Sequence, residues 1–214
     1  MLSNKPHKFF DTFLDNDLKE LNEFLLLKKY ELAMGMVAGV GEEQIKAAGK
    51  EYAQSHNPQR LDSFYNIFQF PNEYIYNLFL ALRDLTKEAC RYYEIDYNQQ
   101  RFMIHGWFNV DSKKTFDLST ATYHDHSGGK GAPYFHGYYC VNAEPSSTFY
   151  NINRESLFEN VNKNNRAILL ETGHPHAIGG FDFGSERITI AYDITPLNLI
   201  TGGGHEEQIW VPLG

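Results

Sequence analysis

The spacing of apolar residues changes near the middle of the chain. Up to about residue 100 they recur every three or four residues, which is the period of a helix with one buried side. From residue 101 onward apolar and polar positions alternate, and Gly, Pro and Asn interrupt the pattern, as in short strands joined by turns. The chain therefore predicts a mainly helical part over 1–100 and a β-rich part over 101–214.

Three helices are predicted in the first part. Asp17 is a candidate N-cap, with Glu20 in the capping-box position, for a helix that ends near residue 30. A weaker helix is predicted over 42–54. The strongest pattern follows Pro71, and its apolar stripe consists of Ile75, Leu78, Leu82, Leu85 and Ala89. Because charged residues occupy the opposite side, we expect this long helix to lie on a sheet.

The second part predicts short strands over 101–110, 120–126, 134–143, 148–151, 166–171, 187–194 and 208–212. A series of short strands at this spacing favours a sandwich or a barrel. No helical pattern separates them, so a parallel doubly wound sheet is not expected. The Asn-rich stretch 151–165 is predicted to be a polar surface loop. We expect one domain over 1–214, with the helices packed outside a single β-core.

Composition and charge narrow the classes of protein and partner. The 214 residues include only 2 Cys, which excludes a disulfide scaffold and a Cys-built zinc site, but 9 His, so any metal is expected on imidazole and oxygen. The net charge of -8 argues against a nucleic-acid partner. The sequence has no apolar stretch of signal-peptide or membrane-spanning length, so we expect a cytoplasmic protein, with no membrane partner, that acts on a small molecule or a peptide.

Two histidine pairs are candidates for metal ligands. The motif Y-H-D-H contains His124 and His126, and the motif G-H-P-H contains His174 and His176. Side chains two residues apart on a strand point to the same face, so His124 and His126 converge while Asp125 points away. His176 follows the apolar strand A-I-L-L-E-T and is the candidate third ligand, with His174 as its rival.

A basic residue lies at the start of a later strand. Arg187 begins R-I-T-I-A-Y-D-I and shares one face with Thr189. A guanidinium presents a rigid fork of donors that matches a carboxylate, and the hydroxyl two residues on adds another donor. Near a metal, this pair is suited to bind the far carboxylate of a dicarboxylate. The alternative is a structural ion pair with Asp182 or Glu186.

The order of these motifs resembles that of the 2-oxoglutarate- and Fe(II)-dependent oxygenases, with the small prolyl-hydroxylase-type enzymes as the nearest branch. The resemblance covers about 101–194 and rests on W-F-N-V (107–110), Y-H-D-H (123–126), H-G-Y-Y-C-V-N (136–142), E-P-S-S-T-F (144–149), H-P-H-A-I (174–178) and R-I-T-I-A-Y-D-I (187–194).

This resemblance implies a double-stranded β-helix, or jelly-roll, and a non-haem Fe(II) dioxygenase. Such an enzyme hydroxylates its substrate, here unknown, while 2-oxoglutarate is oxidatively decarboxylated to succinate, and ascorbate is a candidate reductant. The residues that the resemblance implies are His124, His126 and His176 for the metal, and Arg187, Thr189 and Tyr139 for 2-oxoglutarate.

The ligand set departs from the family pattern in one position. The usual ligands are two His and one carboxylate, whereas the residue two after His124 is His126. Strand alternation favours His126, and Asp125 remains the alternative if the strand carries a bulge.

Two other classes of protein remain open. The H-x-H pair also suits a metal-binding cupin, either an enzyme or a small-molecule sensor, that does not use 2-oxoglutarate. A cupin usually has a Glu a few residues later, and 127–134 contains none. A noncatalytic β-domain that binds a partner or a sugar would leave Arg187 without an explanation.

Overall fold

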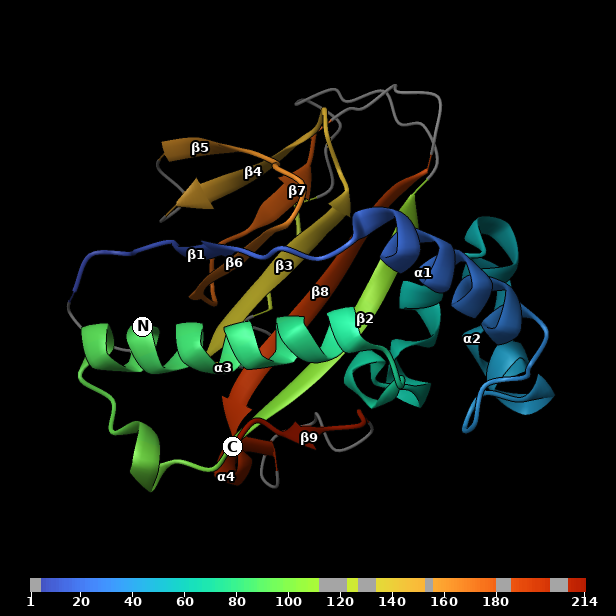
Figure 1. Ribbon diagram of the computed structural model, residues 1–214, viewed down its shortest axis with the longest axis horizontal. Coiled ribbons are helices and arrows are strands. Elements are labelled where there is room, and N and C mark those ends of the chain that lie inside the picture. The colour runs from blue at the N-terminus through green and yellow to red at the C-terminus, as the bar shows by residue number, and fades with distance from the viewer. Residues whose placement is uncertain (1–4, 112–122, 127–133, 153–155, 180–185, 201–207) are drawn as a thin grey trace.

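The chain combines helices with two antiparallel sheets in the computed structural model, which describes residues 5–111, 123–126, 134–152, 156–179, 186–200 and 208–214 (Figure 1). The larger sheet has the strand order β1-β6-β3-β8-β2-β9, and the smaller has the order β5-β4-β7. The strands are Phe10–Phe13 (β1), Phe102–Asp111 (β2), Phe135–Asn142 (β3), Ser147–Ile152 (β4), Ser156–Val161 (β5), Arg166–Glu171 (β6), His176–Ile178 (β7), Arg187–Pro196 (β8) and Val211–Pro212 (β9).

The helical elements precede the long strands, apart from one short helix after β8. They are α1 (Leu18–Ala33), α2 (Glu42–Ser55), α3 (Glu73–Tyr93), α4 (Leu197–Ile200) and the 3-10 segments Pro58–Phe64, Ile67–Gln69 and Tyr97–Gln99. The predicted N-cap of α1 is confirmed, because the Asp17 carboxylate accepts from the backbone amides of Lys19 and Glu20. Glu20 itself accepts from the hydroxyl of Tyr74 on α3.

The long helix lies on the larger sheet, as predicted. The apolar stripe of α3 is buried along its whole length, and the helix contacts β1 and β6 (Figure 1). Strand alternation explains the core that it covers: in β8, residues 188, 190, 192 and 194 are three isoleucines and a tyrosine, and all join this helix-side core.

The opposite face of β8 carries polar side chains that position the candidate site, while on β3 and β6 the same face also holds a second, apolar cluster. In β8 this face carries Arg187, Thr189 and Asp193, all of which are buried. The register pairs Thr189 with Asn109 of β2, and Asp193 with His136 of β3. Three neighbouring strands therefore present polar side chains on the face of the sheet away from the helices.

The predicted strands agree with β2, β3, β4, β6 and β8, and β9 covers the end of the last predicted strand. Of the predicted strand 120–126, residues 120–122 lie outside the described residues, while His124 forms a β-bridge with His176.

The prediction of a surface loop over 151–165 is wrong. Strand β5 lies inside this stretch and pairs with β4 along its whole length. Leu157, Phe158 and Val161 are exposed, so the strand lacks the alternation of buried apolar and exposed polar residues by which strands are recognised. Strand β1 was also not predicted, because its four residues are too few to show a period.

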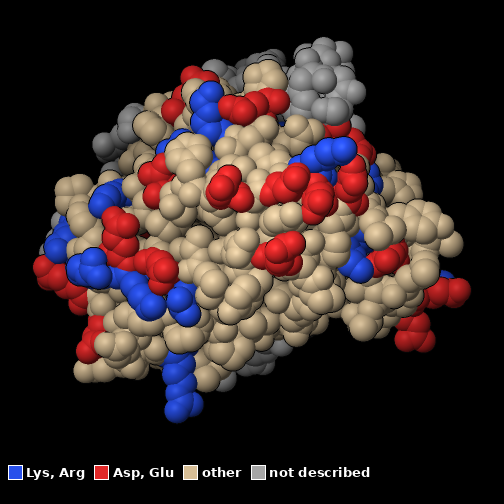
Figure 2. Space-filling model, in the orientation of Figure 1, with Lys and Arg blue, Asp and Glu red and all other residues tan. Residues whose placement is uncertain are grey.

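The helix-bearing face of the molecule carries both signs of charge. Basic and acidic side chains are interspersed over it, without a large basic patch on this face (Figure 2). Among the described helices, none is long and apolar enough to cross a bilayer. Both cysteines are buried free thiols.

Candidate metal centre

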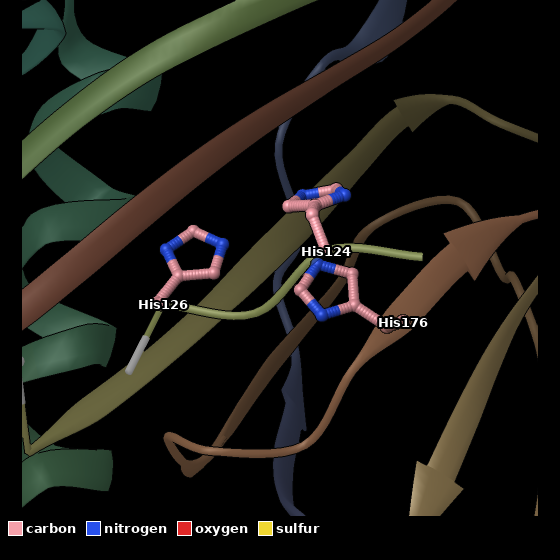
Figure 3. A group of neighbouring side chains, drawn as sticks. All are labelled: His124, His126 and His176. Atoms are coloured by element: carbon pink, nitrogen blue, oxygen red, sulfur yellow. The ribbon is translucent and has the colours of Figure 1, made fainter. Parts of the chain in front are cut away.

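Three histidines from two segments meet between the sheets. The backbone amide of His124 donates to the carbonyl of His176 at 3.1 Å, and the amide of His176 donates to the carbonyl of His124 at 2.8 Å. His126 follows two residues later, and candidate ligand atoms of all three lie within 4.8 Å of one another. In Figure 3, His176 projects from β7 toward the segment that carries the other two rings. We call these residues the three-histidine cluster.

Contacts at Nδ1 orient two of the three rings. Nδ1 of His126 lies 2.8 Å from Oδ1 of Asp193, and Nδ1 of His176 lies 3.2 Å from the backbone carbonyl oxygen of His174. The carbonyl accepts a hydrogen bond, so it favours a proton on Nδ1 of His176 and a free lone pair on its Nε2, while the Asp193 carboxylate is placed as an ion-pair partner of the His126 ring. A carboxylate or carbonyl behind the imidazole is the usual support of a metal-binding histidine.

A fourth histidine, His136 of β3, packs against the cluster. Its ring centroid lies 4.7 Å from that of His126 and 4.9 Å from that of His176. The side chain is buried, and its Nε2 has no hydrogen-bond partner among the described residues. Sequence reasoning did not assign His136 to the site because a single histidine in a strand has no characteristic spacing. Asp193 could have been found, because it shares the alternation of Arg187 and Thr189.

Two of the enclosed rings, His136 and His176, are held in the neutral form. Burial, followed by the neighbouring imidazoles, holds the pKa of His136 and that of His176 well below the ordinary value. Burial acts in the same direction on His126, but the carboxylates around it, Asp193 above all, raise its pKa overall. Neutral imidazoles have the lone pair that a metal ion requires.

Metal-free protein is expected to be less stable at about pH 5.5 than at about pH 7.5. Unfolded histidines, with an ordinary pKa of about 6.5, take up protons below that pH, whereas folded His136 and His176 do not. Folding stability therefore falls as the pH falls, and the raised pKa of His126 offsets only part of the loss. Denaturant unfolding at the two pH values measures the effect. His136→Gln should reduce the slope by up to about 1.4 kcal/mol per pH unit, and an unchanged slope would contradict this assignment.

Arg187 lies on the same polar face, and it is almost completely buried, with 2% exposure. Its Nε donates to Ser146 Oγ at 3.2 Å, and its Nη1 donates to Asp111 Oδ2 at 3.3 Å and to Thr189 Oγ1 at 3.4 Å. Arg187 and Thr189 therefore share a face, as predicted. Among the described residues, Arg187 forms an ion pair with Asp111 on the neighbouring strand, while the carboxylate of Glu186 pairs with Lys29. Asp182 lies outside the described residues.

The prediction that Tyr139 joins Arg187 disagrees with the structure. Tyr139 belongs to the helix-side core, and its hydroxyl bonds with Asn165 and Asn16. Its neighbour Tyr138 lies on the other face of β3, in a second buried cluster that includes Cys140 and Tyr150. The physical reason is the alternation of side chains along a strand, which sends adjacent residues to opposite faces.

The two alternative ligands are separated from the cluster. Asp125 is half-buried and is not part of the three-histidine cluster. The imidazole of His174 lies in a different group, with His7 and Glu171. The pairing of His124 with His176 thus agrees with the preferred interpretation of the sequence, while metal binding by these residues stays a prediction.

Comparisons with known proteins give remote structural similarities. No protein-family model and no curated protein matches the chain. The non-haem alpha-ketoglutarate-dependent epimerase SnoN from nogalamycin biosynthesis is similar over 89% of this chain and 78% of that chain, with 9% identity and a TM-score of 0.47. The nickel complex of the non-haem monooxygenase ThoJ is similar over 96% of this chain and 76% of that chain, with 12% identity and a TM-score of 0.46.

Proposed function

We propose that the chain is a 2-oxoglutarate- and Fe(II)-dependent dioxygenase that hydroxylates a small molecule or a peptide. His124, His126 and His176 would bind Fe(II), and Arg187 with Thr189 would bind 2-oxoglutarate. The observation that carries the proposal is the convergence of the three histidines between two sheets, with a buried arginine on the same polar face.

The strand order supports a double-stranded β-helix as the framework. From β2 onward the larger sheet holds β2, β3, β6, β8 and the short β9, while β4, β5 and β7 lie in the smaller sheet, to which His124 adds a bridge beside β7. A jelly-roll consists of two antiparallel sheets whose strands are exchanged in this alternating way. Its interior lies between the sheets, where the three-histidine cluster is found.

The donors present fit a divalent iron or a similar ion. Three imidazoles on one side suit Fe, Zn, Cu and Ni, and they leave further positions open for a ligand. Iron bound there would supply the redox chemistry with oxygen and the oxo acid. The residues of this chain would hold the metal through three rings, of which His126 is oriented by Asp193 and His176 by the carbonyl of His174, while His124 is exposed.

Arg187 would recognise the far carboxylate of the cosubstrate. Its guanidinium is already fixed by Ser146 and Thr189, which limits the entropy lost when an anion binds. Because Asp111 already contacts the guanidinium, a dicarboxylate would have to share or replace that contact. The contact is long for a charged hydrogen bond, at 3.3 Å.

Asp193→Asn is expected to weaken metal binding by about 10–100-fold while leaving the fold intact. Asn keeps the shape of the side chain but removes the charge behind His126 Nδ1, and outer partners of metal-binding histidines have effects of this size. Competition with a chelator measures the affinity. Thr195→Val, a substitution on the same face of β8, is the matched control, and equal losses in both variants would argue against a specific role for Asp193.

The proposed activity is tested by formation of succinate. Protein loaded with Fe(II), ascorbate and 2-oxoglutarate should release succinate in an oxygen-dependent manner, at a rate that a correct substrate increases. Protein whose His124 and His126 are both replaced by Ala should release none above the background of free iron. Equal rates for the two proteins would refute the proposal.

One observation favours a second candidate, a cupin-type metal protein that does not use 2-oxoglutarate. Arg187 already has an acidic partner in Asp111, so the guanidinium is accounted for without a cosubstrate. This candidate predicts metal binding by the three-histidine cluster without any 2-oxoglutarate affinity.

A further inference from the structure

A second group of metal-binding residue types lies outside the three-histidine cluster. His7 precedes β1, Glu171 ends β6, and His174 lies between β6 and β7. Candidate ligand atoms of these three residues lie within 4.8 Å of one another. We call them the N-terminal cluster, because His7 ties the first described segment of the chain to the sheet.

Local structure brings the three residues together. Strand β1 pairs with β6 so that Phe10 lies opposite Leu169, and the segment before Phe10 therefore runs alongside the end of β6. After Glu171 the chain turns at Gly173, whose φ of 95° is a conformation that favours glycine. This turn returns His174 toward the Glu171 carboxylate.

The contacts within the N-terminal cluster are short, and two of the three side chains are buried. His7 Nδ1 lies 3.1 Å from Glu171 Oε2 and 2.9 Å from His174 Nε2. Glu171 is 3% exposed and His174 is 4% exposed.

One proton cannot satisfy both short contacts well. If His7 Nδ1 carries a hydrogen, that hydrogen must be shared between the Glu171 oxygen and the His174 nitrogen; if it does not, its lone pair faces the carboxylate. A divalent cation accepts one lone pair from each atom and also compensates the buried negative charge. With bonds of about 2.1 Å, the ligand atoms of a tetrahedral ion lie roughly 3.4 Å apart, so the separations of 2.9 and 3.1 Å found here would open by only a few tenths of an ångström when the ion binds.

We propose that the N-terminal cluster binds a divalent first-row cation, with zinc as the metal that two imidazoles and a carboxylate favour. The bound ion would fasten the N-terminal segment to the turn between β6 and β7. The site is separate from the proposed dioxygenase function and does not depend on it. The two clusters are nevertheless connected, because the backbone carbonyl of His174 is the oxygen that faces Nδ1 of His176.

Zinc binding in a background that lacks the other cluster tests the proposal. Protein carrying both His124→Ala and His126→Ala should still bind one equivalent of zinc in equilibrium dialysis. Adding His7→Ala should weaken that binding by at least about a hundredfold, since it removes a ligand itself and not merely an outer partner. His56→Asn in the same background is the matched control, because His56 is exposed and Asn tolerates its left-handed conformation, φ 48°.

A second variant guards against a failure to fold. Glu171→Gln keeps the size of the side chain, and zinc should raise the melting temperature of the background protein but not that of the protein with Glu171→Gln added. If the background protein binds no zinc, or if His7→Ala leaves its affinity unchanged, the proposal is wrong. Failure of the dioxygenase proposal alone would leave this zinc equivalent in place, so the two outcomes are distinguishable.

Discussion

His176→Ala is expected to lower the Fe(II) affinity of the protein by more than about a hundredfold. In the proposed site His176 is the ligand from β7, while the other two ligands come from the segment opposite, so its loss would leave the metal bound from one side only. Removing an outer partner of such a histidine already costs about 10–100-fold, and removing the ligand should cost more. Anaerobic titration with Fe(II) against a chelator measures the change.

His174→Ala is the matched control for this experiment. Both histidines belong to the G-H-P-H motif, but the imidazole of His174 lies in the N-terminal cluster. We expect His174→Ala to retain the visible charge-transfer band that Fe(II) and 2-oxoglutarate give together without oxygen, and His176→Ala to lose it. The opposite result would mean that His174 is the third ligand and that the assignment from the structure is wrong.

Arg187→Ala is expected to destabilise the protein and to weaken 2-oxoglutarate binding. The arginine is buried and pairs with Asp111, which is itself only 15% exposed. Removal of one partner of a buried pair costs about 3–5 kcal/mol, although the bond from Asn57 to Asp111 should reduce this. Loss of the charge that faces the cosubstrate should weaken its binding by at least about thirtyfold. Denaturant unfolding and calorimetric titration measure the two effects.

Asp111→Asn separates the structural role of Arg187 from recognition of the cosubstrate. This variant removes the ion pair but keeps the guanidinium with its bonds to Ser146 and Thr189. If Arg187 binds 2-oxoglutarate, Asp111→Asn should retain or increase the affinity, because an anionic competitor is gone. If both variants leave 2-oxoglutarate binding unchanged, Arg187 is structural and the cupin-type alternative gains support.

The periodicity of the sequence was sufficient for most of the fold. The stripe on α3 predicted both the helix and its buried side, and the side chain of Asp17 marked the start of α1. Strand β5 was not predicted because its apolar residues are exposed. The spacing of apolar residues indicates a strand only where one face of that strand is buried.

The candidate site was predictable where a strand spacing fixed the direction of side chains. The two-residue step from His124 to His126, and the position of His176 after an apolar strand, predicted side chains that the structure brings together. The orientation of β3 was not predictable, because F-H-G-Y-Y-C-V is buried on both faces and has no alternation of polarity. That orientation decides whether Tyr138 or Tyr139 lies on the face of Arg187. It also decides whether His136 packs against the three-histidine cluster.

Contacts between residues that are far apart in the sequence could not be predicted from the sequence pattern. The contact of His7 with Glu171 arises only because β1 adds to the edge of the larger sheet beside β6. The contact of Asp193 with His126 likewise depends on how the segment around His126 crosses β8. The alternation of side chains predicts which residues of one strand share a face. It does not predict which strands lie side by side, and these two contacts depend on that.

We propose that the three-histidine cluster and Arg187 form one site for Fe(II) and 2-oxoglutarate. Titration of 2-oxoglutarate into Fe(II)-loaded protein without oxygen tests it most directly. We expect a weak visible charge-transfer band that saturates at one 2-oxoglutarate per chain and that disappears in His176→Ala. Iron binding with no band and no 2-oxoglutarate affinity would contradict it.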